Sequence, residues 1–198
     1  MSAATFAAAA VNPCAPPLPS FLTRFAERST LGDGTPFTIR PIRSNDKEIE
    51  LCFLRGLSRE SRYQRLLSGR DLLPGELRRL TEIDYTREMA LIATLCRDDS
   101  GEEEIGVARY VLDDAGDSAE FAIVVGDCWQ RRGLGEKLLQ SLFAAAEGAG
   151  VSTLHGITLS TNLAMLRLAK KLGFTLKFQP GDASLMQLTK RWGQTPLK

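Results

Sequence analysis

The chain has few of the residues from which metal sites and disulfide frameworks are built. Its 198 residues include a single histidine, His155, and four cysteines that lie far apart and form no CxxC pair: Cys14, Cys52, Cys96 and Cys128. Zinc sites need several Cys or His ligands at short, regular spacing. We therefore expect no metal, free cysteines, and His155 as an ordinary strand residue of the apolar segment TLHGITL.

An excess of charge of one sign and long apolar runs are also missing. Lys and Arg number 25 against 24 Asp and Glu, so the formal net charge of +1 favours neither nucleic acid nor an anionic membrane as a partner. No apolar run approaches the length of a membrane span, and the N-terminus lacks the basic start of a secretory signal. These absences predict a cytoplasmic protein.

What is present divides the chain into a tail and one domain. Residues 1–30 begin with an Ala- and Pro-rich stretch without helical or strand period, and we expect a disordered tail before a domain of residues 31–192. The pattern predicts strands at 36–43, 88–95, 105–112, 119–125, 153–159, 174–178 and 184–190, with helices after Asp46, after Ser58, from Pro74, from Gly133 and at 162–172. The segment DDSGEEE is expected to form a hairpin turn, and the apolar strand AEFAIVV to be covered on both faces. This order indicates an α/β fold with a mixed sheet and helices on both faces.

The most informative segment is the turn QRRGLG, between the strand at 119–125 and the helix from Gly133. Gly133 and Gly135 have no Cβ, so a ligand is able to lie against the backbone there. The first N–H groups of a helix have no partner within it, and at the positive end of the helix dipole they bind anions. With positive charge added by Arg131 and Arg132, the turn predicts a phosphate or pyrophosphate site.

Residues that the turn lacks narrow the choice of ligand. A P-loop needs Lys and then Ser or Thr after its last glycine, whereas Gly135 is followed by Glu136 and Lys137. A dinucleotide fingerprint needs a third glycine where Leu138 stands. A pyrophosphate held without metal remains, as in coenzyme A, beside the simpler interpretation that two glycines merely shape a strand-to-helix connection.

Two segments in the expected order resemble the GNAT superfamily of N-acetyltransferases. QRRGLG matches the pattern Q/RxxGxG/A with which these proteins hold the coenzyme A pyrophosphate, and NLAMLRLAKKLGF matches their Asn-led helix that closes in Gly-Phe. The resemblance covers roughly residues 36–190. It implies a GNAT-like, mostly antiparallel central sheet of six to seven strands, and acetyl-CoA as the acetyl donor.

Further segments, among them RPIR, RGLSRESRYQR, LTEIDYTREMALIA and AEFAIVV, resemble the acetyltransferase domain of bacterial Pat-type protein lysine acetyltransferases. This narrower resemblance implies protein lysines as acceptors, for example those of metabolic enzymes, and a single-domain version of such a protein. Two alternatives stay open: an acetyltransferase for a small amine, and a catalytically weak module that senses acetyl-CoA. Nothing in the sequence predicts an oligomeric state.

The chemistry needs a base, because a lysine amine with a pKa near 10.4 is almost fully protonated at pH 7. Glu120 is the only carboxylate in the strand that leads to the turn, and partial burial there would raise its pKa toward the working pH. Relatives that acetylate proteins carry a general-base Glu near the start of this strand, which supports Glu120; Glu88 and Asp84 are the reserves.

The resemblance also implies which residues bind the donor. The main chain of Ile123, Val124 and Val125 would hold the acetyl and pantetheine portions, Asn162 would contact the coenzyme, and the turn would bind the pyrophosphate through Gln130, Arg131, Arg132, Gly133, Leu134, Gly135 and Glu136. The chain departs from the family at Ala169, where many relatives have a Tyr that protonates the leaving thiolate. Cys128 has no His nearby in sequence, so direct attack without an acyl-enzyme is expected.

Overall fold

The computed structural model describes residues 20–66, 74–97 and 101–192, and Cys14 of the expected free cysteines lies outside this part of the chain. The helices are α1 (Ser20–Thr23), α2 (Lys47–Gly56), α3 (Arg59–Leu66), α4 (Pro74–Thr81), α5 (Leu134–Gly148) and α6 (Leu163–Lys171), with a short 3-10 turn, η1, at Asp127–Trp129. The strands are β1 (Glu27–Thr30), β2 (Pro36–Pro41), β3 (Glu88–Arg97), β4 (Gly101–Leu112), β5 (Ser118–Val125), β6 (Thr153–Leu159), β7 (Thr175–Gln179) and β8 (Asp182–Arg191).

The strands form one sheet in the order β1-β2-β3-β4-β5-β6-β8-β7. Among the described residues only β5 and β6 pair in parallel, and every other neighbouring pair is antiparallel. The expected α/β fold with a mixed, mostly antiparallel sheet is confirmed. The strand count is eight, because β1 joins the seven strands that the residue pattern predicts.

The boundary of the expected tail is wrong for residues 20–30. These residues form α1 and β1, and β1 pairs with β2 from Glu27↔Ile39 to Thr30↔Pro36. Leu22 of α1 is fully buried in the core. Elements of four residues carry too few positions to show a period, and tertiary contacts rather than local propensity order them. Residues 1–19 of the tail lie outside the described residues.

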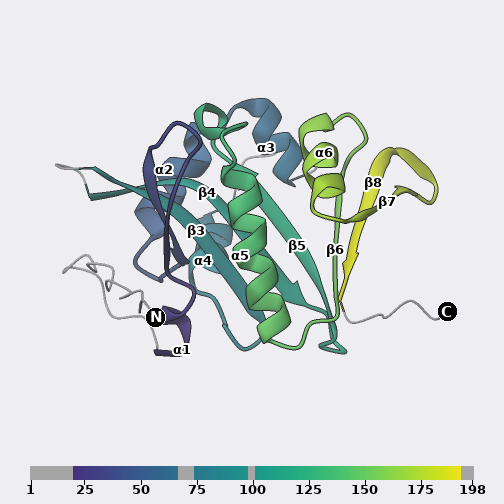
Figure 1. The fold of residues 1–198 in the computed structure, drawn as a ribbon, viewed down its shortest axis with the longest axis horizontal. Coiled ribbons are helices and arrows are strands. Elements are labelled where there is room, and N and C mark those ends of the chain that lie inside the picture. The colour runs from purple at the N-terminus through teal and green to yellow at the C-terminus, as the bar shows by residue number, and fades with distance from the viewer. Residues whose placement is uncertain (1–19, 67–73, 98–100, 193–198) are drawn as a thin grey trace, which may run out of the picture.

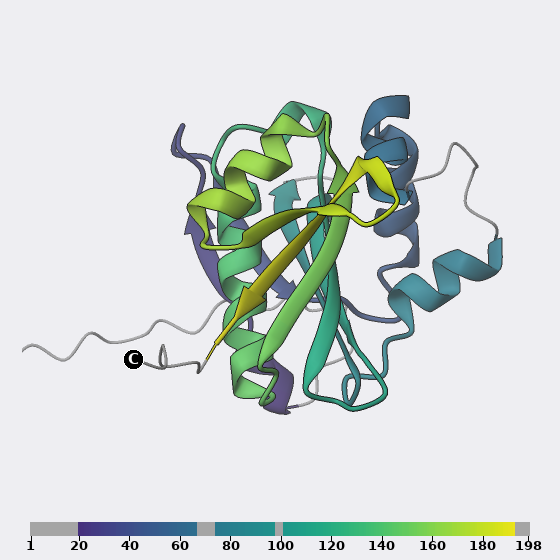
Figure 2. The same ribbon diagram turned by 90° about the vertical axis from the view of Figure 1, so that its right-hand side faces the viewer.

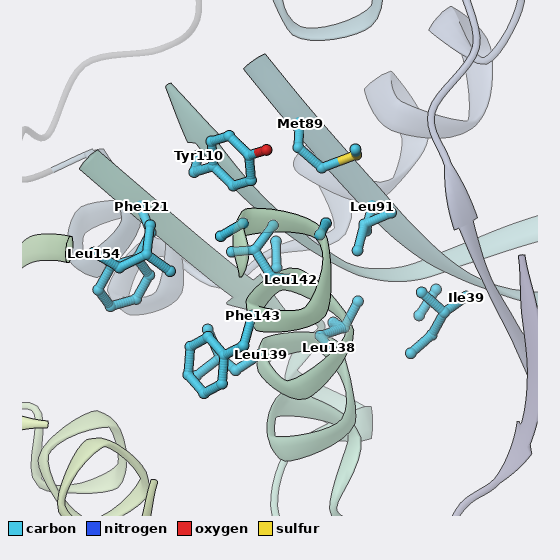
Figure 3. Packing of buried hydrophobic residues seen from close by; sticks show 14 of the residues in the cluster. Ile39, Met89, Leu91, Tyr110, Phe121, Leu138, Leu139, Leu142, Phe143 and Leu154 are labelled. Atoms are coloured by element: carbon cyan, nitrogen blue, oxygen red, sulfur yellow. The ribbon is translucent and has the colours of Figure 1, made fainter. Parts of the chain in front are cut away.

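Helix α5 crosses one face of the sheet (Figure 1). Its apolar side presents Leu138, Leu139, Leu142 and Phe143 to the strands, as the amphipathic pattern predicts. Figure 3 shows these side chains gathered against residues from five strands: Ile39, Met89, Leu91, Tyr110, Phe121 and Leu154. Each buried leucine of this kind stabilises the fold by about 1.5–3 kcal/mol, so this helix holds the strand-to-helix turn firmly at one end of the sheet.

The opposite face of the sheet is covered by α2 and α4 (Figure 1), and buried charges lie beneath α2. Arg40 of β2 makes a bidentate pair with Asp46, at 2.7 and 2.9 Å, and also binds Glu102, at 2.6 and 3.1 Å. Asp46 stands at the N-cap of α2, but its side chain makes no cap hydrogen bond, because Arg40 and the Arg43 N–H use its oxygens. The helix therefore begins after Asp46, as the residue pattern predicts, without a side-chain cap.

A β-bulge directs acidic residues into this face. Ala93 pairs with Gly106 and Thr94 with Glu104, so Ile105 has no partner across the ladder. Residues 101–104 of the segment expected as an acidic turn thus form the first part of β4, while residues 98–100 lie outside the described residues. Thr94 donates a hydrogen bond to Glu102. The sequence alone does not reveal that Glu102 and Glu104 turn toward this face, because Glu102 pairs with Arg40 of β2 and Glu104 lies beside Glu50 of α2.

Glu104 makes the stability of the fold depend on pH. Its own burial and the neighbouring Glu50 carboxyl raise its pKa well above the ordinary value of 4.5. The native state therefore keeps a proton that the unfolded chain loses above about pH 4.5. The free energy of unfolding then falls as pH rises, by up to about 1.4 kcal/mol per pH unit.

We expect Glu104→Gln, which keeps a neutral group in place, to remove this decline. Thermal unfolding measured between pH 5 and pH 8 checks it, with Glu147→Gln on the exposed side of α5 as the control variant. A decline of equal size in Glu104→Gln and wild type would show that another group binds the proton.

Candidate active site

The site begins where β5 and β6 separate. Their parallel ladder has only three pairs, Ser118↔Thr153, Ala119↔Leu154 and Glu120↔His155, whereas β5 stays paired with β4 as far as Val125. Figure 1 shows the two strands side by side at one end and apart at the end where α3 and α6 lie. Beyond Glu120, β5 therefore presents main-chain N–H and C=O groups that no strand on this side uses. The prediction that this strand is covered on both faces is wrong, since Glu120 is exposed and Ile123 and Val125 are only half-buried.

A cavity of about 550 Å³ occupies this separation, with α3 and α6 on opposite sides of it (Figure 2). Its lining brings together ten of the twelve residues expected to form the site: Glu120, Ile123, Val124, Val125, Gln130, Arg131, Gly133, Gly135, Glu136 and Asn162. Arg132 and Leu134 are absent from the lining. Leu134 is the first residue of α5, and its side chain is buried in the core between this helix and the sheet.

The turn after β5 has the geometry of an anion site. Gly133 stands at the N-cap of α5 with φ of 87°, in the left-handed region that favours glycine. The first hydrogen bond of the α5 helical ladder runs from the Lys137 N–H to the Gly133 carbonyl, at 3.2 Å. The N–H groups of residues 134–136 come before this bond, where a helix offers no carbonyl partner of its own. A Cβ on Gly135 would lie 3.2 Å from Leu168 Cδ2 of α6, so the two helices approach closely at this point.

The two arginines of the turn have different surroundings. Arg131 adopts φ of 58°, unusual for a residue with a side chain, and it is exposed in the cavity lining. Arg132 instead pairs with Asp33 at 2.8 Å and lies over the Trp129 ring, 5.1 Å from its centroid. Arg131 is thus the arginine whose side chain is placed to meet an anionic ligand, while Arg132 braces the turn against the loop between β1 and β2.

Glu120 lies at the last β5–β6 pair and lines the cavity. The carboxylate is exposed, so the partial burial expected from sequence is wrong. Glu88 lies on the same row of the sheet, because Val111 pairs with both Glu88 and Glu120, but two strand spacings of roughly 10 Å separate it from Glu120. Asp84 accepts hydrogen bonds from Thr86. Neither reserve residue lines the cavity, so Glu120 remains the predicted base.

Helix α6 starts at the far wall of the cavity. Asn162 is its N-cap, where Oδ1 accepts the Met165 N–H at 3.1 Å and Nδ2 donates to Thr158 at 3.2 Å. Its contact with the coenzyme stays a prediction. Ala169 is fully buried in the core and does not line the cavity, so no tyrosine-like acid stands at this position.

Three polar residues near the turn were missed from the sequence: Ser61 and Gln64 of α3, which line the cavity, and Asp127 of η1. Asp127 accepts hydrogen bonds from Ser58 and Ser61. Partial burial opposes its ionisation, but these bonds outweigh burial and lower the pKa of Asp127 below its ordinary value of 3.8. The serines at 58 and 61 were the available signal, since this spacing is common at helix N-termini.

Comparison with known proteins settles the family. The acetyltransferase (GNAT) domain family matches residues 37–175, well over half of the chain. The chain belongs to the GNAT acetyltransferase family. Since GNAT acetyltransferases take the acetyl group from acetyl-CoA, the expected donor is confirmed.

Relatives of this GNAT acetyltransferase include bacterial enzymes. Acetyltransferase PA5475 of Pseudomonas aeruginosa is 32% identical over 156 residues, 78% of this chain and 83% of that protein. Acetyltransferase Pat of Mycolicibacterium smegmatis is 30% identical over 79% of this chain, which spans only 46% of that longer protein. The GNAT domain of S. lividans PAT superposes with a TM-score of 0.77 at 27% identity, covering 89% of this chain and all of that one. The resemblance to Pat-type domains is confirmed.

The described residues also bear on metal binding, on the cysteines and on membrane-spanning helices. Within residues 20–66, 74–97 and 101–192, the GNAT acetyltransferase has no group of three or more His, Cys, Asp or Glu side chains suited to a metal ion. Cys52, Cys96 and Cys128 are free and exposed, and none of the three lines the cavity. No helix in the described ranges is long and apolar enough to cross a membrane.

Lys171 of the GNAT acetyltransferase pairs with a carboxylate beside the turn. It pairs at 2.6 Å with Glu136, a carboxylate in the first turn of α5 that lines the cavity. We expect Lys171→Ala to weaken acetyl-CoA binding about two- to fivefold, because Glu136 is then left uncompensated beside an anionic ligand. Calorimetric titration measures this, with the adjacent exposed Lys170→Ala as control. Equal weakening in both variants would point to general surface charge instead of this pair.

Proposed function

We propose that this GNAT acetyltransferase transfers the acetyl group of acetyl-CoA to the side-chain amines of protein lysines. The observation that carries this proposal is the position of Glu120, at the mouth of the cavity and open to solvent. Its neighbours on the same face of the sheet are also exposed: His155 beside it, Val111 across β4, and Ile157 further along β6. An open rim of this kind suits a long lysine side chain presented from another protein's surface.

The likeness to Pat supports the same acceptor class. Two of the similar proteins, Pat of M. smegmatis and the PAT domain of S. lividans, carry this name, and the matches cover 79% and 89% of this chain. Because the chain spans about half of the M. smegmatis protein, the acceptor is proposed for this domain alone.

Glu120 has one chemical task in this proposal, to take a proton from the acceptor ammonium directly or through water. Holding the free amine at pH 7 costs about 4–5 kcal/mol without such a base. The amine then forms the N–C bond as the C–S bond of the thioester breaks, and the electron pair leaves on the coenzyme sulfur as a thiolate. The nitrogen loses its second proton to this thiolate, directly or through water, which gives the coenzyme thiol, with a pKa close to the 8.5 of cysteine. Bound acetyl-CoA supplies the activated acetyl group.

The other residues of the cavity bind and orient. The strand β5 from Ile123 to Val125 runs along the cavity with no strand paired on the β6 side. Main-chain groups that point to this side suit the amide groups of the coenzyme and developing negative charge. The N–H groups at the start of α5 and the Arg131 side chain suit the pyrophosphate. Cys128 lies outside the cavity lining, which supports direct attack without an acyl-enzyme.

Labelled acetyl-CoA tests the acceptor class. The protein is incubated with a bacterial lysate and with a panel of small amines in parallel, and modified lysines are mapped by mass spectrometry. Protein lysines labelled above the non-enzymatic background, and lost in Glu120→Gln, are the expected result. Labelling of small amines alone would favour the small-amine acetyltransferase, and binding of acetyl-CoA without any transfer would favour the sensor.

A further inference from the structure

Helix α3 forms one wall of the cavity, and its described side chains, those of residues 59–64, are mostly polar. Tyr63 is 46% exposed. The buried residue of this range, at 6% exposed, is the polar Ser61. Elements with few buried apolar contacts open at low free-energy cost. The position of this wall therefore depends strongly on its polar contacts.

One carboxylate, that of Asp127, accepts three hydrogen bonds from the start of α3 and the residue before it. Asp127 Oδ2 accepts the Ser58 N–H at 2.9 Å, and Oδ1 accepts the hydroxyls of both Ser58 and Ser61 at 2.8 Å. Ser58 directly precedes α3, and its hydroxyl also accepts the Ser61 N–H at 3.1 Å, as an N-cap does. An acidic residue from 69 positions downstream thus completes the cap of α3 and balances its helix dipole.

The same carboxylate belongs to the segment that carries the pyrophosphate turn. Asp127 lies in η1, between the end of β5 and Gln130, the first residue of QRRGLG. Gln130 Nε2 donates to Ser61 Oγ at 3.3 Å and to the Val125 carbonyl at 3.2 Å. The Ser61 hydroxyl therefore joins both sides of η1, donating to Asp127 and accepting from Gln130. Hydrogen bonds thus run without a break from the donor strand to the opposite wall of the cavity.

We propose that Asp127 is a positioning residue that couples the donor turn to α3, so that acetyl-CoA bound at the turn fixes the wall against which the acceptor is placed. The inference rests on the proposed function for the identity of the two ligands. Asp127 itself does not line the cavity, and it acts through Ser58 and Ser61. Ser61 and Gln64 are the residues of α3 that face the cavity.

Coupling of this kind predicts a change in the dynamics of α3. In the wild type, bound coenzyme A restrains the turn, and through Asp127 it slows the opening of α3. Removing the carboxylate removes three hydrogen bonds of this link and leaves the longer, 3.3 Å bond from Gln130 to Ser61. The N–H groups of α5 and the edge of β5 stay intact. The backbone of α3 then exchanges faster, and coenzyme A no longer protects it.

Hydrogen–deuterium exchange of the full chain tests the coupling without relying on turnover. Asp127→Ala is compared with Asp182→Ala, whose carboxylate makes the same kind of bonds to a serine, Ser184, within the β7–β8 hairpin. We expect faster exchange across residues 59–66, and loss of the protection induced by coenzyme A, in Asp127→Ala alone. Unchanged exchange in this variant overturns the proposal.

Kinetics separate positioning from general destabilisation. For Asp127→Ala we expect acceptor kcat/KM to fall roughly tenfold while the coenzyme A Kd stays within about twofold of wild type. Asp127→Asn keeps one acceptor oxygen for the two hydroxyls and should recover part of the loss. A Kd that rises together with the loss of kcat/KM would mean that Asp127 shapes only the donor site.

Failure of the proposed function has a different signature. If the wild type modifies no protein lysine, the acceptor assignment fails, while protection of α3 by coenzyme A and its loss in Asp127→Ala still report the coupling. If coenzyme A protects the start of α5 but leaves α3 unaffected in wild type, the donor site stands and the coupling is wrong.

Discussion

Gly133→Glu is expected to abolish acetyl-CoA binding, with a Kd at least about a hundredfold above that of the wild type. The φ of 87° at this position costs roughly 1–3 kcal/mol for a residue with a side chain. A carboxylate next to the first turn of α5 adds repulsion of the pyrophosphate and occupies the positive end of the helix. A Cβ built at Gly133 meets no atom within 4 Å, so the variant has room to fold.

A matched glycine separates loss of binding from loss of fold. Gly181, in the turn between β7 and β8, has φ of 83° and equally empty surroundings, and it does not line the cavity. Gly181→Glu therefore carries the same backbone strain and charge without reaching the site. Calorimetric titration should show normal binding in Gly181→Glu and none in Gly133→Glu. Comparable affinity in the two variants would move the pyrophosphate site away from the start of α5.

Glu120→Gln is expected to lower kcat for a lysine acceptor by roughly 10²–10⁴, the usual worth of a general base. The amide keeps the size of the side chain but accepts no proton at neutral pH. Because the donor is held by β5 and by the start of α5, the Kd for acetyl-CoA should stay within about twofold of wild type. Steady-state kinetics with a lysine peptide whose side-chain amine is unmodified measure kcat, and calorimetry measures the Kd for acetyl-CoA.

The pH profile strengthens this test. Residual turnover of Glu120→Gln should rise steadily toward the lysine pKa of about 10.4, since solvent then removes the proton that Glu120 no longer takes. Glu147→Gln, on the exposed side of α5, should behave as wild type. If Glu120→Gln retains full kcat at pH 7, the base is a different group.

Much of this fold was predictable because its central elements repeat a clear pattern. The leucines of α5 recur at helical spacing, and Leu138, Leu139 and Leu142 are all buried where the period places them. The turn was predictable for a local reason, since Gly133 adopts the left-handed conformation for which glycine is suited. Within the site, Glu120 and Gln130 were found because the same short segment carries both.

The remaining features depend on contacts between distant parts of the chain. The bulge opposite Ala93 is a property of two paired strands, so the acidic stretch at 102–104 read as a turn although Glu104 is buried. The capping carboxylate of α3 comes from Asp127, which no local pattern joins to Ser58. Glu120 shares an exposed row on one face of the sheet with Val111 and His155, and the order of apolar residues in a strand does not show which face stays uncovered.

A crystal structure of the protein with acetyl-CoA would locate the coenzyme relative to Glu120 and the turn. We expect the pyrophosphate on the N–H groups at the start of α5, beside Arg131. We also expect the pantetheine chain along the open edge of β5, and the thioester at the end of the cavity nearest Glu120. Density for the coenzyme outside the opening between β5 and β6, or with the thioester directed away from Glu120, would contradict this placement.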